Sequence, residues 1–165
     1  MATGVYTKFK EQIANSSVSI PDSTFKALLY STGYIDVGST ARTDQDFVLN
    51  APNSSESVEA FELSTVGGGY DRVTLGARTI TEVDARDAVE IDSADVTFSN
   101  VSSSAGGPAG GMVIFAELQE ADSSGRYVST FYDFSTAVTL NGGDIVVSFS
   151  TGGWLEFLAS TSDAS

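Results

Sequence analysis

The sequence predicts an all-β protein: one antiparallel β-sandwich, jelly-roll-like, with a short helix or arm at its N-terminus. Short runs rich in Val, Thr, Ile and aromatic residues recur along residues 60–159, and several alternate apolar and polar side chains. Segments rich in Gly, Asn, Asp and Ser separate these runs, as is typical of sandwiches and barrels. A length of 165 residues indicates a single domain, residues 1–165. We expect an arm over 1–20, the sandwich over 21–159 and a frayed tail over 160–165.

The N-terminal segment predicts a short amphipathic helix over residues 5–14, VYTKFKEQIA, which ends near Asn15. Three apolar side chains recur at helical spacing, and two lysines flank them. One interpretation is that this stripe packs on the protein's own sandwich and leaves the lysines in solvent. The other is that the helix docks on a partner, where the lysines meet carboxylates, because a solitary helix this short needs a surface to pack against. The residues of this predicted interface are Tyr6, Lys8, Phe9, Lys10 and Ile13.

The strands follow from the β-rich runs and the turns between them. Pro21 and Asp22 mark a turn, after which TFKALLYS predicts a strand over 24–31. A short helical turn is expected within 38–50, where Thr43 can cap it. The glycine-rich segments GGG and GGPAGG are expected to be hairpin loops, because neither carries a phosphate-binding motif. Further strands are predicted, in chain order, at 60–64, 70–84, 88–92, 95–100, 111–121, 125–135, 144–150 and 154–159.

The charge balance is strongly acidic. Eight Lys and Arg residues face 22 Asp and Glu residues, which gives a net charge of −14 and a pI near 4.1. Such a surface repels nucleic acid and anionic lipid, so neither is expected as a partner. No apolar run has the length of a membrane span, and we expect no signal peptide. The composition favours a protein adapted to molar salt, where charge repulsion is screened; an ordinary acidic protein is the alternative.

The segment DARDAVEIDSADVTFSN, residues 84–100, combines a strand pattern with many carboxylates. Because neighbouring residues of a strand point to opposite faces, Val89 and Ile91 are expected on a buried face and Glu90 and Asp92 on a solvent face. A solvated strand face therefore explains the acids. The alternative is a calcium site, although no D-x-D-x-D-G loop is present. The candidate ligands for such a site are Asp84, Asp87, Asp92 and Asp95.

The chain contains no histidine and no cysteine. A Ser-His-Asp triad, a thiolate nucleophile and zinc sites built from His and Cys are therefore impossible within this chain. A serine–lysine pair or a pair of carboxylates could still act, but no S-x-x-K motif stands near the three lysines. We therefore predict no catalytic residue and no cofactor, with a carboxylate hydrolase kept in reserve.

Five segments of the chain occur in a recognisable order. They are KALL at 26–29, EIDSADVTF at 90–98, VIFAEL at 113–118, FYDF at 131–134 and NGGDIVVSF at 141–149. This order resembles the small capsid decoration, or head-associated, proteins of tailed viruses. The resemblance covers roughly residues 5–158 and rests on strands and turns rather than on catalytic motifs.

The resemblance implies a non-enzymatic virion protein that binds the outside of the assembled capsid shell as a decoration, a brace or a surface projection. Combined with the acidity, it suggests a tailed virus of a halophilic archaeon, with assembly in the host cytoplasm and a final location on the capsid surface. The implied partners are the major capsid protein and further copies of the chain, as a trimer or as a pentamer or hexamer. The alternative function is a β-sandwich that binds host-surface glycan, with calcium as a possible aid.

Overall fold

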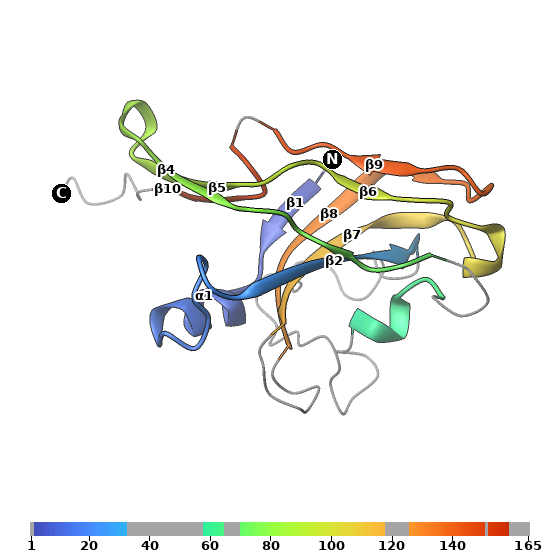
Figure 1. Cartoon of the computed structure of the whole chain (residues 1–165), viewed down its shortest axis with the longest axis horizontal. Coiled ribbons are helices and arrows are strands. Elements are labelled where there is room, and N and C mark those ends of the chain that lie inside the picture. Colours follow the sequence, from blue (N-terminus) through green and yellow to red (C-terminus); the bar gives the residue numbers. More distant parts are fainter. Residues whose placement is uncertain (1, 33–57, 65–69, 118–125, 151, 159–165) are drawn as a thin grey trace.

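The computed structural model describes residues 2–32, 58–64, 70–117, 126–150 and 152–158 (Figure 1). Most of the described elements are antiparallel strands, accompanied by one α-helix and three short 3₁₀ turns. The prediction of an all-β antiparallel fold is therefore confirmed. In the described ranges, no helix is both long enough and apolar enough to cross a membrane.

The larger of two layers is a five-stranded antiparallel sheet. Its central strand pair is formed by β7 (Ala109–Glu117) and β8 (Arg126–Val138). The order across the sheet is β1-β8-β7-β2-β3. The remaining strands are β1 (Ala2–Val5), β2 (Thr24–Ser31) and β3 (Val73–Thr74).

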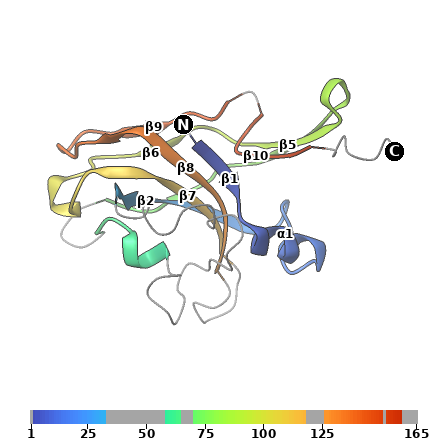
Figure 2. The same ribbon diagram turned by 180° about the vertical axis from the view of Figure 1, so that it is seen from behind.

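The second layer consists of two smaller antiparallel sheets that lie over one face of the larger sheet (Figures 1 and 2). One is a three-stranded sheet in the order β10-β5-β4, which we call the wing. The wing extends past the strand ends of the larger sheet, on the side where helix α1 lies (Figures 1 and 2). The strands of the layer are β4 (Thr79–Val83), β5 (Ala88–Asp92) and β10 (Leu155–Leu158) in the wing, and β6 (Val96–Phe98) paired with β9 (Ile145–Val147). The arrangement is sandwich-like, and a jelly-roll-like connectivity stays a prediction.

Aromatic side chains join the two layers. The ring of Phe25 on β2 lies 5.1 Å, between centroids, from that of Trp154, which precedes β10. Tyr70 and Phe98 pack edge to face at 5.8 Å. Strand β7 is buried from Ala109 to Ala116, which explains why its sequence is apolar almost without a break. Aromatic packing between the layers therefore forms part of the core.

The N-terminal residues form a strand before they form a helix. The prediction of a helix from residue 5 is wrong at its start, because β1 pairs with β8 through residue Val5. Helix α1 (Thr7–Ala14) follows, and Asn15 ends it as predicted. The Tyr6 amide donates to the Ser129 carbonyl oxygen at 3.0 Å, so the β pairing continues to the first turn of the helix.

Three other predicted elements differ from the structure. The predicted strand 60–64 is a 3₁₀ turn, η2 (Val58–Phe61), followed by one isolated bridge from Glu62 to Tyr30. The predicted strand 70–84 is divided into β3 and β4, because residues 75–78 belong to neither strand. The last two glycines of GGPAGG are inside β7 rather than in a loop. The predicted helical turn at 38–50 and the tail 160–165 lie outside the described residues.

Candidate functional site

The N-terminal helix does not present the predicted apolar stripe to a partner. Tyr6 and Phe9 are fully buried in the protein's own core. The Tyr6 ring packs edge to face on Phe131 at 5.6 Å, and the Phe9 ring packs on Phe25 at 6.1 Å. The prediction that these two rings contact a partner is therefore corrected, since burial of the rings against the sheet is what holds this short helix in place.

The rest of the predicted N-terminal interface is less buried. Lys10 is exposed and Ile13 is half-buried beside the core. The backbone of Lys8 lies in α1, and its side chain is outside the described part of the structure. A contact between the helix and a partner can thus involve Lys10 and the exposed part of Ile13. This contact stays a prediction.

The four candidate calcium ligands lie in two separate places. Asp84 begins a 3₁₀ turn, η3 (Asp84–Arg86), and Asp87 follows it, so both lie at the outer end of β5. Asp92 accepts a hydrogen bond from the Ser93 amide at the inner end. The five residues of β5 span about 16 Å at ~3.3 Å per residue, and this length separates Asp84 and Asp87 from Asp92 and Asp95. In the described ranges, no three acidic side chains come together as a metal site.

Asp95 has a structural role at the junction of the second layer. Its carboxylate accepts hydrogen bonds from the Ser148 hydroxyl at 2.8 Å and from the Phe149 amide at 3.2 Å. These bonds tie the start of β6 to the segment after β9. The oxygen atoms of Asp95 are thus used within the fold.

The predicted division of β5 into a buried and a solvated face is partly wrong. Ile91 is buried, but Val89 on the same face is 38% exposed. Both belong to β5 of the wing, which extends past the larger sheet (Figure 1). On the opposite face, Asp92 is exposed as predicted, whereas Glu90 is partly buried. The acids of this strand therefore have different environments.

Glu90 belongs to an ion cluster that spans the wing. Register places Glu90 directly opposite Glu156 on β10. Arg86 contacts the Glu90 carboxylate, and its Nη1 lies 3.0 Å from Glu156 Oε1. One guanidinium thus compensates two carboxylates that would otherwise repel each other across the sheet. The arrangement is an ion cluster, and sequence reasoning missed it because β10 is far from β5 in the chain.

Replacing Arg86 with alanine should therefore destabilise the wing. Removal of the Arg86 guanidinium leaves the carboxylates of Glu90 and Glu156 opposite each other. Because these groups are partly exposed, we expect a loss of about 1 kcal/mol in the free energy of unfolding. The measurement is denaturant unfolding at low salt. The double variant Arg86→Ala, Glu156→Gln should recover much of the loss. If it is as unstable as the single variant, the repulsion argument is wrong.

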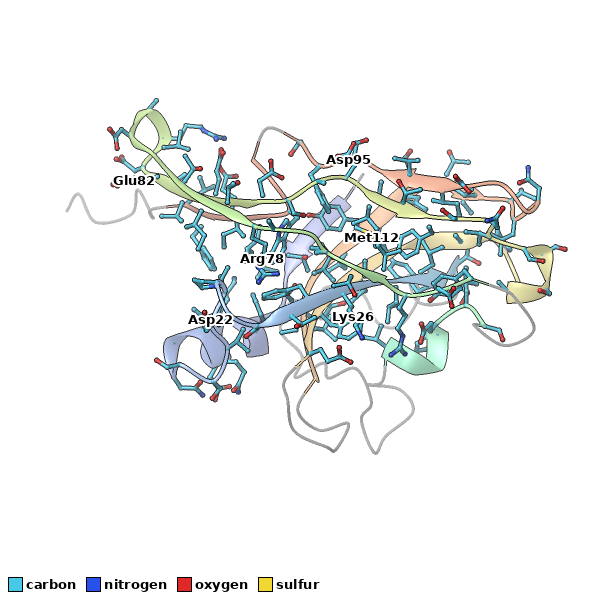
Figure 3. All side chains as sticks on the ribbon, in the orientation of Figure 1. Asp22, Lys26, Arg78, Glu82, Asp95 and Met112 are labelled. Carbon is cyan, nitrogen blue, oxygen red and sulfur yellow. The ribbon has the colours of Figure 1, made fainter. Side chains whose placement is uncertain are left out.

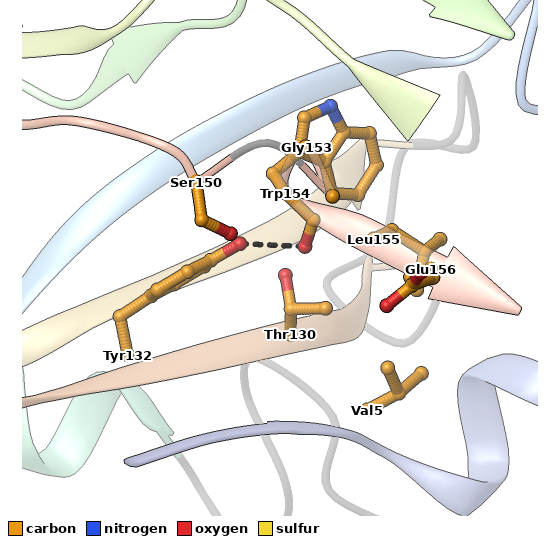
Figure 4. Close-up of a pocket in the computed structure, with 9 residues that line it drawn as sticks. Val5, Thr130, Tyr132, Ser150, Gly153, Trp154, Leu155 and Glu156 are labelled. Carbon is orange, nitrogen blue, oxygen red and sulfur yellow. Dashed lines mark hydrogen bonds between the residues drawn. The ribbon is translucent and has the colours of Figure 1, made fainter. Parts of the chain in front are cut away.

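A small polar pocket lies between the two layers, where β1 and β8 face the start of β10 (Figure 4). It has a volume of about 250 Å³. The Tyr132 hydroxyl donates to the Trp154 carbonyl oxygen at 2.5 Å. Burial raises the pKa of Tyr132 well above its usual range, so its phenol stays neutral at physiological pH. The side chains that line the pocket offer hydroxyl groups and the carboxylate of Glu156, which already forms an ion pair with Arg86. Its side-chain polar groups belong to Thr130, Tyr132, Ser150 and Glu156.

A second buried phenol links the sheet to the η2 turn. The Tyr70 hydroxyl donates to Glu62 Oε1 at 2.6 Å and accepts from the Leu29 amide at 3.2 Å. Arg72 Nε donates to the same Glu62 oxygen at 2.8 Å. Burial, together with the Glu62 charge, raises the pKa of Tyr70 well above its usual range. The phenol is a structural group that must remain neutral.

Protein stability should fall at alkaline pH because of these tyrosines. The pKa values of Tyr70 and Tyr132 are higher in the folded protein than in the unfolded chain, where a tyrosine pKa is about 10. The neutral phenols therefore stabilise the fold fully below about pH 10, and this stabilisation is lost as the pH rises above that value. Each tyrosine adds a slope of at most about 1.4 kcal/mol per pH unit. Urea unfolding of the protein and of Tyr70→Phe across this range tests the idea. Parallel slopes in the two proteins would contradict it.

The exposed apolar side chains concentrate on the wing. Among the described residues, four large apolar side chains are strongly exposed, and three of them are in the wing. These are Ile80 at 50%, Val89 at 38% and Leu158 at 64%, with Val146 of β9 at 58% as the fourth. A hollow of about 350 Å³ lies at the outer end of the wing, near Glu82 (Figure 3). Its lining residues are Glu82, Asp84, Asp87, Ala88, Val89, Phe157 and Leu158.

Comparisons with protein-family models, with curated proteins and with solved structures found no match to this chain.

Proposed function

We propose that this protein is a non-enzymatic structural protein of a tailed-virus particle that binds the outside of the assembled capsid shell. The observation that carries the proposal is the wing, which extends past the larger sheet and carries three of the four strongly exposed large apolar side chains among the described residues. By register, Ile80 and Val89 lie on one face of the wing and Leu158 lies on the other. Exposed apolar side chains gathered on one element are typical of protein interaction sites. The resemblance of residues 5–158 to capsid decoration proteins supports the same role.

The mechanism is adhesion. The wing contacts the major capsid protein, and further copies of the chain associate around a symmetry axis of the shell, as a trimer or as a pentamer or hexamer. Each contact can be weak, because many copies on a symmetric shell act together. Several described carboxylates support the fold itself: Glu62 binds Tyr70 and Arg72, Glu90 and Glu156 bind Arg86, and Asp95 binds Ser148.

The alternative, a glycan-binding sandwich, has less support. Carbohydrate sites commonly offer exposed aromatic rings, and the aromatic side chains in the described part of the chain are buried or half-buried. Trp154, which lines the polar pocket, is only 2% exposed, so its ring is not accessible for stacking. The pocket could bind a small polar molecule through its hydroxyl groups, but such binding would be accessory to adhesion.

Quantitative composition of purified virus particles tests the proposal. We expect the protein in many copies, at a fixed ratio to the major capsid protein, and at repeated positions on the outer surface in particle reconstructions. If the protein is absent from particles, the proposal is wrong. If it is absent from particles and binds glycans in solution, the alternative function replaces it.

Protein stability should depend on salt. The net charge of −14 is screened within a few Å at molar salt, whereas the screening length grows to about 10 Å at 0.1 M salt and repulsion returns. We therefore expect a lower melting temperature, or release from the shell, as salt falls from molar concentrations to 0.1 M. A nonionic osmolyte at matched osmolarity is the control, because it leaves charges unscreened. A melting temperature that does not change with salt would contradict the expectation.

A further inference from the structure

The hollow at the outer end of the wing combines an apolar floor with an acidic rim. Val89 and Phe157 lie directly opposite each other in register on neighbouring strands and share one face of the sheet. Three acidic residues of β4 and the following turn, Glu82, Asp84 and Asp87, also line the hollow. The hollow of about 350 Å³ is large enough for one long side chain.

Strand β4 makes this part of the wing suitable for protein binding. It is the edge strand of the wing, and its first four residues are all exposed. An exposed edge offers unpaired backbone groups to an added strand, while alternate side chains of that strand enter neighbouring pockets. The exposed apolar side chains of Ile80 and Val89 lie beside this edge.

The rim determines the chemistry of the occupant. Within the described residues, the three rim carboxylates have no ion pair, because Arg86, the nearest cation in sequence, is bound to Glu90 and Glu156. An aliphatic stem packs on the apolar floor, and a cationic head placed among the carboxylates forms charge-assisted hydrogen bonds. We infer that the hollow receives a lysine or arginine side chain from an extended segment of a partner protein that lies along β4. This inference rests on the proposed function and names the part of this chain that receives the capsid protein.

A second copy of this chain is a poor source of that side chain. The cations in the described part of the chain are mostly engaged within the fold. Lys26 pairs with Glu117 at 2.6 Å, Arg72 with Glu62, and Arg78 donates to the carbonyl oxygens of Ile20 and Pro21. Lys10 is the described lysine that is exposed and has no ion pair. Two chains that each carry a net charge of −14 also repel each other, so a less acidic partner is favoured.

The first experiment measures attachment to virus particles from which the protein has been removed. The test variants are Val89→Ser and the triple variant Glu82→Gln, Asp84→Asn, Asp87→Asn. The matched control is Val146→Ser, which alters an even more exposed valine on β9, outside the wing. We expect binding about tenfold weaker for each test variant, with little change for the control. In the triple variant, the salt dependence of binding should also decrease.

The outcomes separate the inference from the proposed function. If the unmodified protein binds the particles and both test variants bind like Val146→Ser, the wing hollow is not the attachment point and the inference is overturned. If the unmodified protein does not bind, the proposed function fails. A Lys10→Ala variant that loses binding as strongly as the triple variant would assign the contact to a second copy and would also overturn the inference.

A second experiment tests the hollow without the particle. The probe is Nα-acetyl-lysine amide, titrated against isotope-labelled protein and followed by nuclear magnetic resonance. We expect saturable shifts at the amides of Val89, Phe157 and Leu158, which are lost in the triple variant. Shifts spread over the acidic surface, or unchanged in the triple variant, would overturn the assignment of the hollow to a cationic side chain.

Discussion

Replacement of Gly111 with alanine is expected to prevent stable folding. Gly111 on β7 lies in register between Tyr30 on β2 and Asp133 on β8. The Tyr30 phenol crosses over it to donate to the Tyr132 carbonyl oxygen at 3.1 Å and to contact the Asp133 carboxylate. A Cβ at position 111 would overlap both the Tyr30 hydroxyl and the Tyr132 carbonyl oxygen. Because one of these atoms is backbone in the centre of the sheet, the strands themselves would have to separate.

The expected cost is about 3 kcal/mol or more in the free energy of unfolding, at the upper end of the range for overpacked cores. Denaturant unfolding, or loss of soluble expression, measures it. Gly76→Ala is the matched control, since a Cβ there has no atom within 4 Å. That control should be neutral or slightly stabilising. Equal stability of the two variants would show that the Tyr30 ring can move aside at little cost.

Replacement of Phe25 with alanine is expected to have the second largest effect. The ring is fully buried and contacts three different parts of the fold: Phe9 of the helix, Trp154 of the second layer and the Arg78 guanidinium, which lies 5.1 Å from the ring centre. Loss of a buried phenylalanine ring typically costs about 3–5 kcal/mol. The helix should also become mobile, because the Phe9 ring loses its neighbour.

Thermal unfolding and amide exchange of the helix measure this effect. Phe25→Leu, which keeps most of the apolar contact, should lose much less stability. Val146→Ala provides the exposed control and should remain within about 0.5 kcal/mol of the original protein. If amide exchange in α1 does not change in Phe25→Ala, the helix is held by Tyr6 and Phe131 rather than by the Phe9–Phe25 contact.

Local patterns predicted the strands well where the apolar run was long or the flanking turns were distinct. The strand predicted at 24–31 and the strand predicted at 88–92 coincide with β2 and β5. Local patterns failed where the structure depends on partners distant in sequence. The segment 60–64 has a strand-like composition, but packing of Val58 and Leu63 into the core favours a turn there.

The candidate interface was predicted less well than the fold. Tyr6 and Phe9 show helical spacing, but spacing cannot reveal whether the surface that covers an apolar stripe belongs to the same chain or to another. Conversely, Val89 was expected in the core because its strand alternates correctly. Val89 is exposed, and it belongs to the wing, which extends past the larger sheet. How far the wing extends depends on how the two layers pack together. The pairing of Glu90 with Glu156 likewise requires the strand order of the wing.

The pairing of β1 with β8 has a consequence for biosynthesis. Residues Ala2–Val5 are synthesised more than a hundred residues before their partners, Thr130–Asp133. Until then the N-terminal strand has no edge to join, and the rings of Tyr6 and Phe9 have no core to enter. Such distant pairings make folding slow and leave apolar segments exposed to aggregation in the meantime. The nascent chain must therefore stay soluble while unfolded, and its many carboxylates, which repel one another, favour that state.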